Sequence, residues 1–150
     1  MEQQERIVVG ADGSEESVEA VRWAVRQAAL TGATVQVVTA WEVPMAYGAG
    51  MMIMPDEAEF DAAAKQVAEQ TVRAAAAEDG QVQVERTTVM GHPARVLTEA
   101  AEGAALLVLG GRGRGGFKGM LLGSVSQHCV ANGPCPVVVV RTATAPTGPR

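Results

Sequence analysis

The sequence predicts one α/β domain built on a doubly wound, five-stranded parallel sheet with helices on both faces. Short β-branched runs alternate along the chain with longer alanine-rich segments whose apolar residues recur at helical spacing. Most of the short runs are apolar throughout, which is typical of strands covered on both faces. A length of 150 residues suits a single domain, and 47% hydrophobic residues suffice for a core without disulfides or metal.

Five segments are expected to be strands and four to be helices. The strands are expected at residues 7–9, 34–40, 82–89, 106–109 and 137–140, and the helices at residues 15–31, 56–78, 94–102 and 124–131. The third strand segment partly alternates polar and apolar residues, which favours a half-exposed edge strand. Because a helix joins each strand to the next, the strands run parallel, and ligands of such sheets bind beyond the carboxyl ends of the strands.

The first helix is expected to begin just after a turn that carries an aspartate. Ser14 is the expected N-cap, and Glu15, Glu16 and Glu19 suit the positive end of the helix dipole. For Asp12 two interpretations stay open. It either caps this helix alone, or it caps the helix and also contacts a ligand.

Charge is distributed unevenly along the chain. The net charge is −5, yet all 17 acidic residues lie at or before Glu102, and five of the 12 basic residues follow it. An acidic protein lacks the basic face that general nucleic-acid binding requires. The simplest interpretation is a local anion site in the last third of the chain. A polar start and the absence of a long apolar run predict a cytoplasmic protein with no membrane span.

A glycine-rich segment connects the fourth strand to the last helix. Seven of the 14 residues from Gly110 to Gly123 are glycine, and the segment also contains Arg112, Arg114 and Lys118. Glycine lets main-chain N–H groups converge on phosphate oxygens, and the helix that follows adds free N–H groups and a positive dipole end. The alternative is a plain flexible connection between strand and helix. Ordering such a connection would cost conformational entropy that no ligand contact offsets.

Two common phosphate-binding motifs do not explain this segment. A Walker A loop requires lysine before serine or threonine, whereas Lys118 precedes Gly119. Residues 111–116 match the dinucleotide fingerprint by letter, but they follow the fourth strand, and no acid lies further on to hold a ribose. A third spacing is present: Gly-x-x-Gly at 110–113, nine residues, and then Gly-Ser at 123–124.

This spacing resembles the ATP-binding loop of the universal stress protein family. Residues 7–14 are similar to the family's opening strand and its Asp-bearing turn, residues 91–97 to its turn into the third helix, and residues 134–140 to its closing strand. We therefore expect a universal stress protein domain over residues 1–141 and a disordered tail over residues 142–150. The resemblance implies a Rossmann-like fold of the HUP type with strand order 3-2-1-4-5. It also implies a homodimer through the Val137–Val140 edge strand.

The resemblance further implies ATP, bound together with Mg²⁺, as the ligand. The residues implied to contact it are Gly10, Ala11, Asp12, Ala40, Gly110, Gly111, Arg112, Gly113, Arg114, Gly115, Gly116, Gly123, Ser124 and Val125. Asp12 would face the ribose or a phosphate-bound Mg²⁺, and the main chain at Ala40 would read the adenine edge.

The remaining reactive residues are expected to be structural. Cys129 suits the core, His92 a surface turn, and His128 a structural or interface position. With two histidines and no acid beside either of them, no hydrolytic constellation is supported, so we expect slow ATP hydrolysis at most. Residues 45–55 contain four methionines and are expected to form a long loop. It either borders the site as an adaptable lid or partner surface, or is a loose connection.

The leading expectation is a nucleotide-dependent regulatory module of the stress response, with an unidentified downstream protein partner. Two rivals stay open. The first is an enzyme of the same architecture that uses a nucleotide in nucleotidyl transfer or α-phosphate chemistry, which would require a further substrate pocket. The second is a protein-interaction module that has lost nucleotide binding.

Overall fold

Strands and helices alternate along the whole described chain. The computed structural model describes residues 4–43, 56–77, 80–112 and 122–142. The elements are β1 (Arg6–Gly10), α1 (Glu15–Thr31), β2 (Thr34–Trp41), α2 (Glu57–Ala74), β3 (Val84–Met90), α3 (Pro93–Ala100), β4 (Leu106–Gly110), α4 (Ser124–Asn132) and β5 (Val137–Val140). All pairings are parallel and the order is β3-β2-β1-β4-β5, which confirms the predicted fold and strand order.

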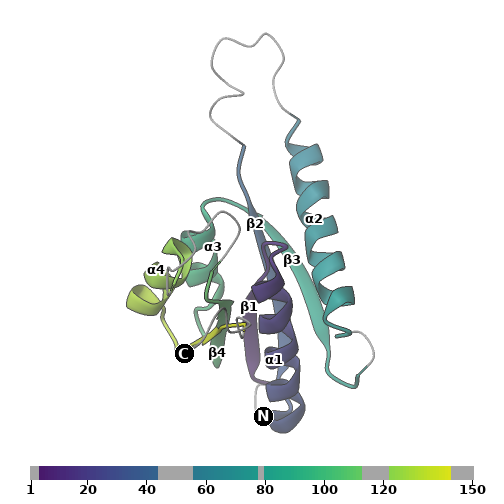
Figure 1. Cartoon of the computed structure of the whole chain (residues 1–150), viewed down its shortest axis with the longest axis vertical. Coiled ribbons are helices and arrows are strands. Elements are labelled where there is room, and N and C mark those ends of the chain that lie inside the picture. Colours follow the sequence, from purple (N-terminus) through teal and green to yellow (C-terminus); the bar gives the residue numbers. More distant parts are fainter. Residues whose placement is uncertain (1–3, 44–55, 78–79, 113–121, 143–150) are drawn as a thin grey trace, which may run out of the picture.

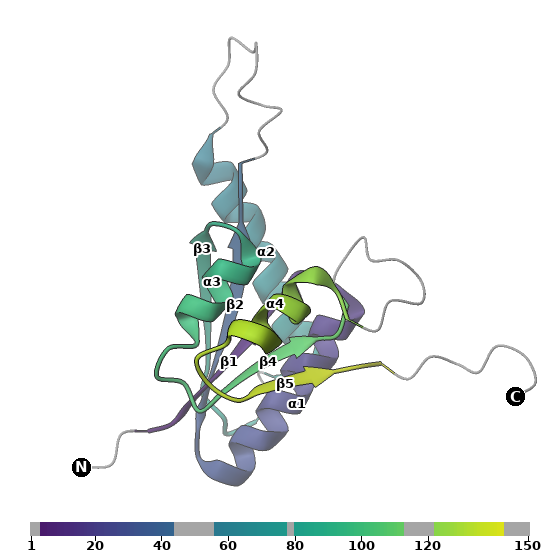
Figure 2. The same cartoon turned by 90° about the vertical axis from the view of Figure 1, so that its left-hand side faces the viewer.

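Helices cover both faces of the sheet. In Figure 1, α1 and α2 lie on one side of the strands and α3 and α4 on the other, and the turned view of Figure 2 shows α3 and α4 in front of the sheet. Alternate residues of β1 supply the two cores: Ile7 and Val9 pack with α1, whereas Val8 packs with α3 and α4. Each fully buried valine contributes about 1.5–3 kcal/mol through the hydrophobic effect.

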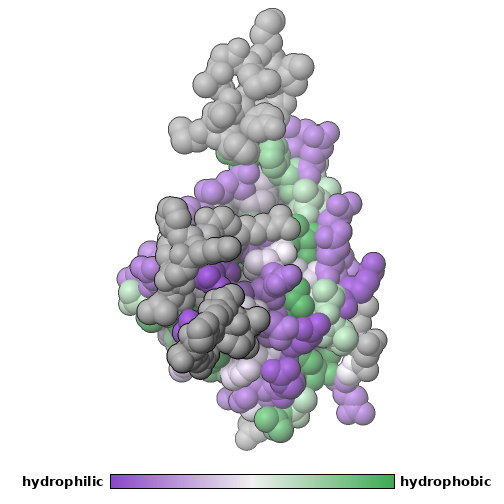
Figure 3. Space-filling model, in the orientation of Figure 1, coloured by the Kyte–Doolittle hydropathy of each residue, from purple (hydrophilic) through white to green (hydrophobic). Residues whose placement is uncertain are grey.

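The expected edge strand and core cysteine are both found. β3 lies at one edge of the sheet, with Val89 and Met90 exposed, and Cys129 is fully buried on α4. Figure 3 shows hydrophilic and hydrophobic side chains intermixed over the described part of the face that bears α1 and α2. No helix in the described part of the chain combines the length and apolarity that a membrane span requires.

Three of the four helices begin at a side-chain cap. The hydroxyl of Ser14 accepts from the N–H of Ser17, and Asp56 accepts from the second residue of α2. His92 is exposed in a turn, as expected, and its Nδ1 accepts from Ala94 N–H at the start of α3. These contacts fix where α1, α2 and α3 begin, because each satisfies a first-turn N–H group that has no partner within the helix.

Candidate functional site

The described candidate residues gather at the carboxyl edge of the sheet. In the strand register Gly10 of β1 lies beside Val38 of β2, and Val9 lies beside Val108 of β4. Ala40 therefore lies near the end of β2, next to the exit of β1, and Gly110 ends β4 on the other side of β1. One edge thus brings together three neighbouring strand ends.

The exit of β1 is tightly packed. The N–H of Ala11 donates to the carbonyl oxygen of Val38 at 2.9 Å, so the chain follows β2 for one residue beyond the strand. A Cβ at Gly10 would lie 2.9 Å from Leu97 Cδ1 and 3.0 Å from Leu109 Cδ2. The packing of α3 and β4 against β1 therefore requires a glycine at position 10, whether or not a ligand binds there.

Asp12 is exposed in the turn between β1 and α1. Its Oδ1 accepts from the main-chain N–H of Ser14 at 2.9 Å, and Ser14 in turn caps the helix. Asp12 therefore stabilises the turn before α1. The N-cap of α1 is Ser14, not Asp12.

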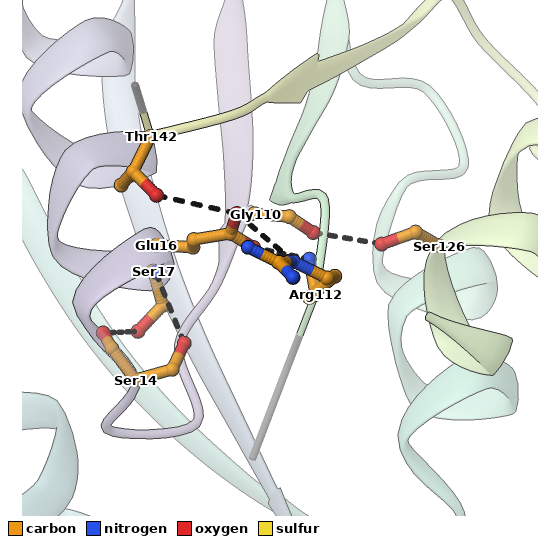
Figure 4. Close-up of polar contacts among 7 residues, drawn as sticks. All are labelled: Ser14, Glu16, Ser17, Gly110, Arg112, Ser126 and Thr142. Atoms are coloured by element: carbon orange, nitrogen blue, oxygen red, sulfur yellow. Dashed lines mark hydrogen bonds and ion pairs between the residues drawn. The ribbon is translucent and has the colours of Figure 1, made fainter. Parts of the chain in front are cut away.

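The exit of β4 lies directly on α1. A Cβ at Gly110 would lie 2.8 Å from the Cβ and 2.9 Å from the main-chain carbon of Glu16, so only glycine permits this approach. On the other side, the carbonyl oxygen of Gly110 accepts from the buried hydroxyl of Ser126 in α4 at 2.7 Å (Figure 4). The first residue of the glycine-rich segment is thus held between two helices.

The two ends of the glycine-rich segment are bonded to each other. The N–H of Gly111 donates to Val140 of β5 at 2.9 Å, and the carbonyl oxygen of Gly111 accepts from Gly123 N–H at 2.6 Å. Gly123 is the N-cap of α4, so the segment leaves the sheet and returns to it at the same place, beside the start of a helix.

The N-terminus of α4 differs from the other three. Gly123 makes no side-chain cap hydrogen bond, and its φ of −72° and ψ of 170° are extended backbone. Ser124 is exposed and Val125 half-buried in the first turn. The first turn of a helix presents N–H groups and the positive end of the dipole, which together suit an anion.

Glu16 is a site residue that sequence reasoning assigned only to the helix dipole. Its Oε2 accepts from the main-chain N–H of Arg112, and its Oε1 lies 3.7 Å from the Arg112 guanidinium Nε. The Arg112 side chain is therefore directed at Glu16 (Figure 4). The sequence does indicate that Glu16 faces the core, because it lies on the same face of the helix as Ala20, Ala24 and Ala28, at intervals of four residues. In the structure all four residues are buried.

The end of β2 is fixed to α2 by a polar cluster around Asp61. Its Oδ1 accepts from the Thr88 hydroxyl at 2.6 Å and from Trp41 Nε1 at 3.1 Å, and its Oδ2 lies 3.1 Å from Lys65 Nζ. The hydrogen bond from Thr88, followed by that from Lys65, lowers the pKa of the Asp61 carboxyl. The Trp41 ring also stacks on Phe60, with centroids 6.4 Å apart. These contacts hold Trp41, the neighbour of Ala40, in place.

Comparison with known proteins decides the family. The model of the universal stress protein family matches residues 4–141. The chain belongs to the universal stress protein family. A universal stress protein of Mycobacterium tuberculosis strain H37Rv is 36% identical over 138 residues, which are 90% of this chain and 45% of the relative. The chain thus spans about half the length of the curated relatives that it matches over most of its residues.

Solved universal stress protein structures share this fold. One, determined in complex with cAMP, has a TM-score of 0.69 and 29% identity, and the match covers 95% of this chain and all of that one. Another, from Archaeoglobus fulgidus in complex with dAMP, has a TM-score of 0.63 and 22% identity, and the match covers 93% of this chain and 99% of that one. At 22% identity this second likeness concerns the fold alone.

Part of the predicted universal stress protein site lies outside the described residues. This applies to Gly113, Arg114, Gly115 and Gly116, and to the methionine-rich segment 45–55. Within the described ranges, no group of three or more His, Cys, Asp or Glu side chains could hold a metal ion. Mg²⁺ is commonly held by one or two carboxylates together with ligand phosphates, so Asp12 fits an ion that arrives with a nucleotide.

Proposed function

We propose that this universal stress protein binds an adenine nucleotide, ATP with Mg²⁺, at the carboxyl edge of the sheet. It then acts as a cytoplasmic, nucleotide-dependent module of the stress response. One observation carries the proposal: α4 begins at a glycine without a side-chain cap, and that glycine is bonded to the exit of β4. A helix N-terminus of this kind is suited to phosphate. The cAMP complex of a relative that is 29% identical supports a nucleotide as the ligand.

The described residues suggest where each part of the nucleotide lies. The phosphates would accept from the main-chain N–H groups of Ser124 and Val125, together with those of residues 113–116. The N–H groups of Gly111, Arg112 and Gly123 already donate within the protein and would hold the frame of the site. The ribose or its Mg²⁺ would face Asp12, which is exposed at the exit of β1. The adenine would meet the main chain at Ala40, where β2 ends beside β1. The order phosphate, ribose, base then follows the strand ends from β4 through β1 to β2.

Binding, with slow hydrolysis at most, fits this geometry better than rapid turnover. Efficient phosphoryl transfer requires a positioned base or water-holding residue and a cationic clamp on the phosphates. Asp12 already accepts from Ser14 N–H and is the proposed Mg²⁺ ligand. Arg112 is directed at Glu16. We therefore propose that ligand binding changes the state of the glycine-rich segment and is sensed by a protein partner.

We also propose that a second copy of the chain pairs with β5. This strand lies at the edge of the sheet, and its four valines, Val137–Val140, are each only partly buried in the single chain. An apolar edge strand presents unpaired N–H and C=O groups to another chain. Sedimentation at micromolar concentration should give the mass of a dimer, and a monomeric mass would contradict this part of the proposal.

Calorimetric titration of nucleotide-stripped protein tests the main proposal. ATP, AMP and cAMP should be titrated with and without Mg²⁺ into the wild type and into Gly113→Asp. Saturable binding that Gly113→Asp removes is the expected result. Gly80→Asp is the matched control, because a Cβ at Gly80 meets only Val82 N, at 4.0 Å, far along the sequence from the site. No binding at millimolar nucleotide would favour the interaction-module rival, and new nucleotide products would favour the enzyme rival.

A further inference from the structure

We propose that Glu16 is a positioning residue that joins the start of the glycine-rich segment to the end of β5. Its carboxylate contacts both places at once, so a change at one is transmitted to the other. The structural part of this inference stands by itself, and only its consequence for nucleotide affinity depends on the proposed function.

Glu16 is unusual in its burial. Only 7% of it is exposed, and it is the only Asp, Glu, Lys or Arg that is buried among the residues the structure describes. Burying a carboxylate is costly unless charged or hydrogen-bonding partners surround it. These partners come from distant parts of the chain, since Arg112 lies 96 residues and Thr142 lies 126 residues further on.

The two carboxylate oxygens divide the partners. Oε2 accepts from the main-chain N–H of Arg112, and Oε1 lies 3.7 Å from the Arg112 Nε and accepts from the Thr142 hydroxyl at 3.5 Å. Arg112 is the second residue after β4, and Thr142 is the second residue after β5. Figure 4 shows Glu16 extending from α1 between these two chain segments.

Main-chain contacts leave the same segments little independent freedom. Gly111 N–H donates to Val140 at 2.9 Å, and Gly110 lies so close to α1 that a Cβ would meet the main chain of Glu16 at 2.9 Å. When Arg112 moves, the carboxylate must follow it or lose the charge-assisted bond, and either event disturbs Thr142. The glycine-rich segment and the end of β5 are therefore coupled through the Glu16 side chain in addition to the Gly111–Val140 main-chain bond.

A role confined to the helix dipole predicts something different. Glu15 has the same charge and precedes Glu16 in the first turn of α1, but it is exposed. If the dipole alone mattered, removing either carboxylate would have the same effect. Glu15→Ala is therefore the matched control for Glu16→Ala.

Hydrogen exchange of the nucleotide-free protein, read by mass spectrometry, tests the coupling directly. Glu16→Ala should speed exchange about tenfold or more in peptides that contain residues 110–112 and 140–142, whereas Glu15→Ala should not. Thr142→Val replaces the hydroxyl with a methyl group of similar size and should speed exchange mainly near residue 142. Glu16→Gln retains one acceptor oxygen for Arg112 N–H and should fall between Glu16→Ala and the wild type.

The result that overturns the proposal is equal exchange in Glu16→Ala and Glu15→Ala. Peptides from α2 report whether the fold is intact, because they should exchange as in the wild type in every variant. The affinity for ATP should fall about tenfold in Glu16→Ala and stay at the wild-type value in Glu15→Ala. If Glu16→Ala bound ATP more tightly and exchanged as the wild type does, the Glu16 carboxylate would be an anion that competes with the phosphates. That result would also overturn the proposal. If the wild type binds no nucleotide, the proposed function fails, and the exchange data still decide the role of Glu16.

Discussion

The N–H of Gly123 donates to the carbonyl oxygen of Gly111 across 2.6 Å. This bond joins the last residue of the glycine-rich segment to its second, and the N–H of Gly111 is bonded to β5 at the same time. The start of α4 is therefore held in register with the sheet itself. A ligand at this helix N-terminus would consequently meet a framework that is in place before it binds, which limits the entropy lost on binding.

Gly110→Ala tests how closely the exit of β4 approaches α1. The new Cβ would lie 2.8 Å from the Cβ and 3.1 Å from the main-chain oxygen of Glu16, and main-chain atoms of a helix cannot give way easily. We expect the free energy of unfolding to fall by about 1–3 kcal/mol, as is typical of overpacking. Denaturant titration measures the loss, with Gly80→Ala as the control in open surroundings. A loss no larger than in that control would contradict the close approach.

Ser126→Ala and Ser124→Ala should separate stability from binding. Ser126 is 4% exposed and its hydroxyl donates to Gly110, so its removal leaves the partly buried carbonyl oxygen of Gly110 without this donor. The expected cost is about 1–3 kcal/mol of unfolding free energy. Ser124 is exposed in the first turn of α4, where we expect its hydroxyl to donate to a phosphate in addition to its N–H. Removal of that hydroxyl should weaken nucleotide binding and leave stability within about 0.5 kcal/mol. Thermal melts and calorimetry distinguish the two, and the opposite assignment would contradict the geometry.

The fold was predictable because short-range patterns specify it. The apolar runs around Val8, Val37 and Val108, separated by amphipathic segments, lead to a parallel sheet by general rules of topology. Helix ends were less accurate. The second helix, expected to reach residue 78, ends at Ala74, because Ala76 adopts a left-handed φ of 54° and the N–H of Ala77 bonds to Val72, five residues back. Alanine favours helix at every one of these positions, so composition gives no sign of the turn.

The candidate site was predictable only where glycine and serine mark it. The glycine spacing indicated the segment between β4 and α4, but not the Gly111–Gly123 bond that joins its ends. The role of Glu16 depends on Arg112 and Thr142, which become its neighbours only after β4 and β5 have been placed. Similarly, Asp61 meets Trp41 and Thr88 through the packing of α2 on two strands. Polar contacts between distant segments leave no periodic trace in the sequence, so they require the tertiary structure.

Asp61 should make the free energy of unfolding depend on pH in the acidic range. Its folded-state pKa is lowered from 3.8, chiefly by the Thr88 hydrogen bond, so the carboxylate favours the folded state above 3.8. That contribution is lost as the pH falls below 3.8 and through the lowered folded-state value, where the group is protonated in both states. We expect Asp61→Asn to be less stable than the wild type at neutral pH and the difference to shrink in this acidic range. Denaturation followed by tryptophan fluorescence measures it, and a difference that is constant with pH would contradict the assignment.

The two cysteines should differ in reactivity. Cys129 is fully buried, and burial raises the pKa of its thiol to about 11, so almost no thiolate forms at neutral pH. Burial also raises the pKa of the Cys135 thiol, but this residue is partly exposed at the turn before β5. Alkylation of the native protein followed by mass spectrometry should modify Cys135 first and Cys129 only after unfolding. Equal rates in the native protein would show that α4 opens readily.

Gly123→Asp should separate a capped helix from an anion site. The backbone of Gly123, with φ of −72° and ψ of 170°, is one that aspartate adopts easily as an N-cap. The new carboxylate would accept from the first-turn N–H groups of α4, which stabilises the helix by a few tenths of a kcal/mol over glycine. It would also occupy the proposed phosphate position and repel the ligand. We expect an unchanged or higher melting temperature with nucleotide affinity lowered about a hundredfold, equivalent to about 2.8 kcal/mol.

Gly123→Asn is the control for that substitution, because asparagine caps equally well without a charge. Its affinity should lie between those of the wild type and Gly123→Asp, since the neutral amide competes for the same N–H groups but does not repel phosphate. If all three proteins bound ATP equally, the phosphates would not lie at the start of α4. If both variants lost affinity and stability together, the side chain would have disrupted the Gly111–Gly123 bond instead. The pair of measurements therefore tests the position of the phosphates separately from the integrity of the framework that holds them.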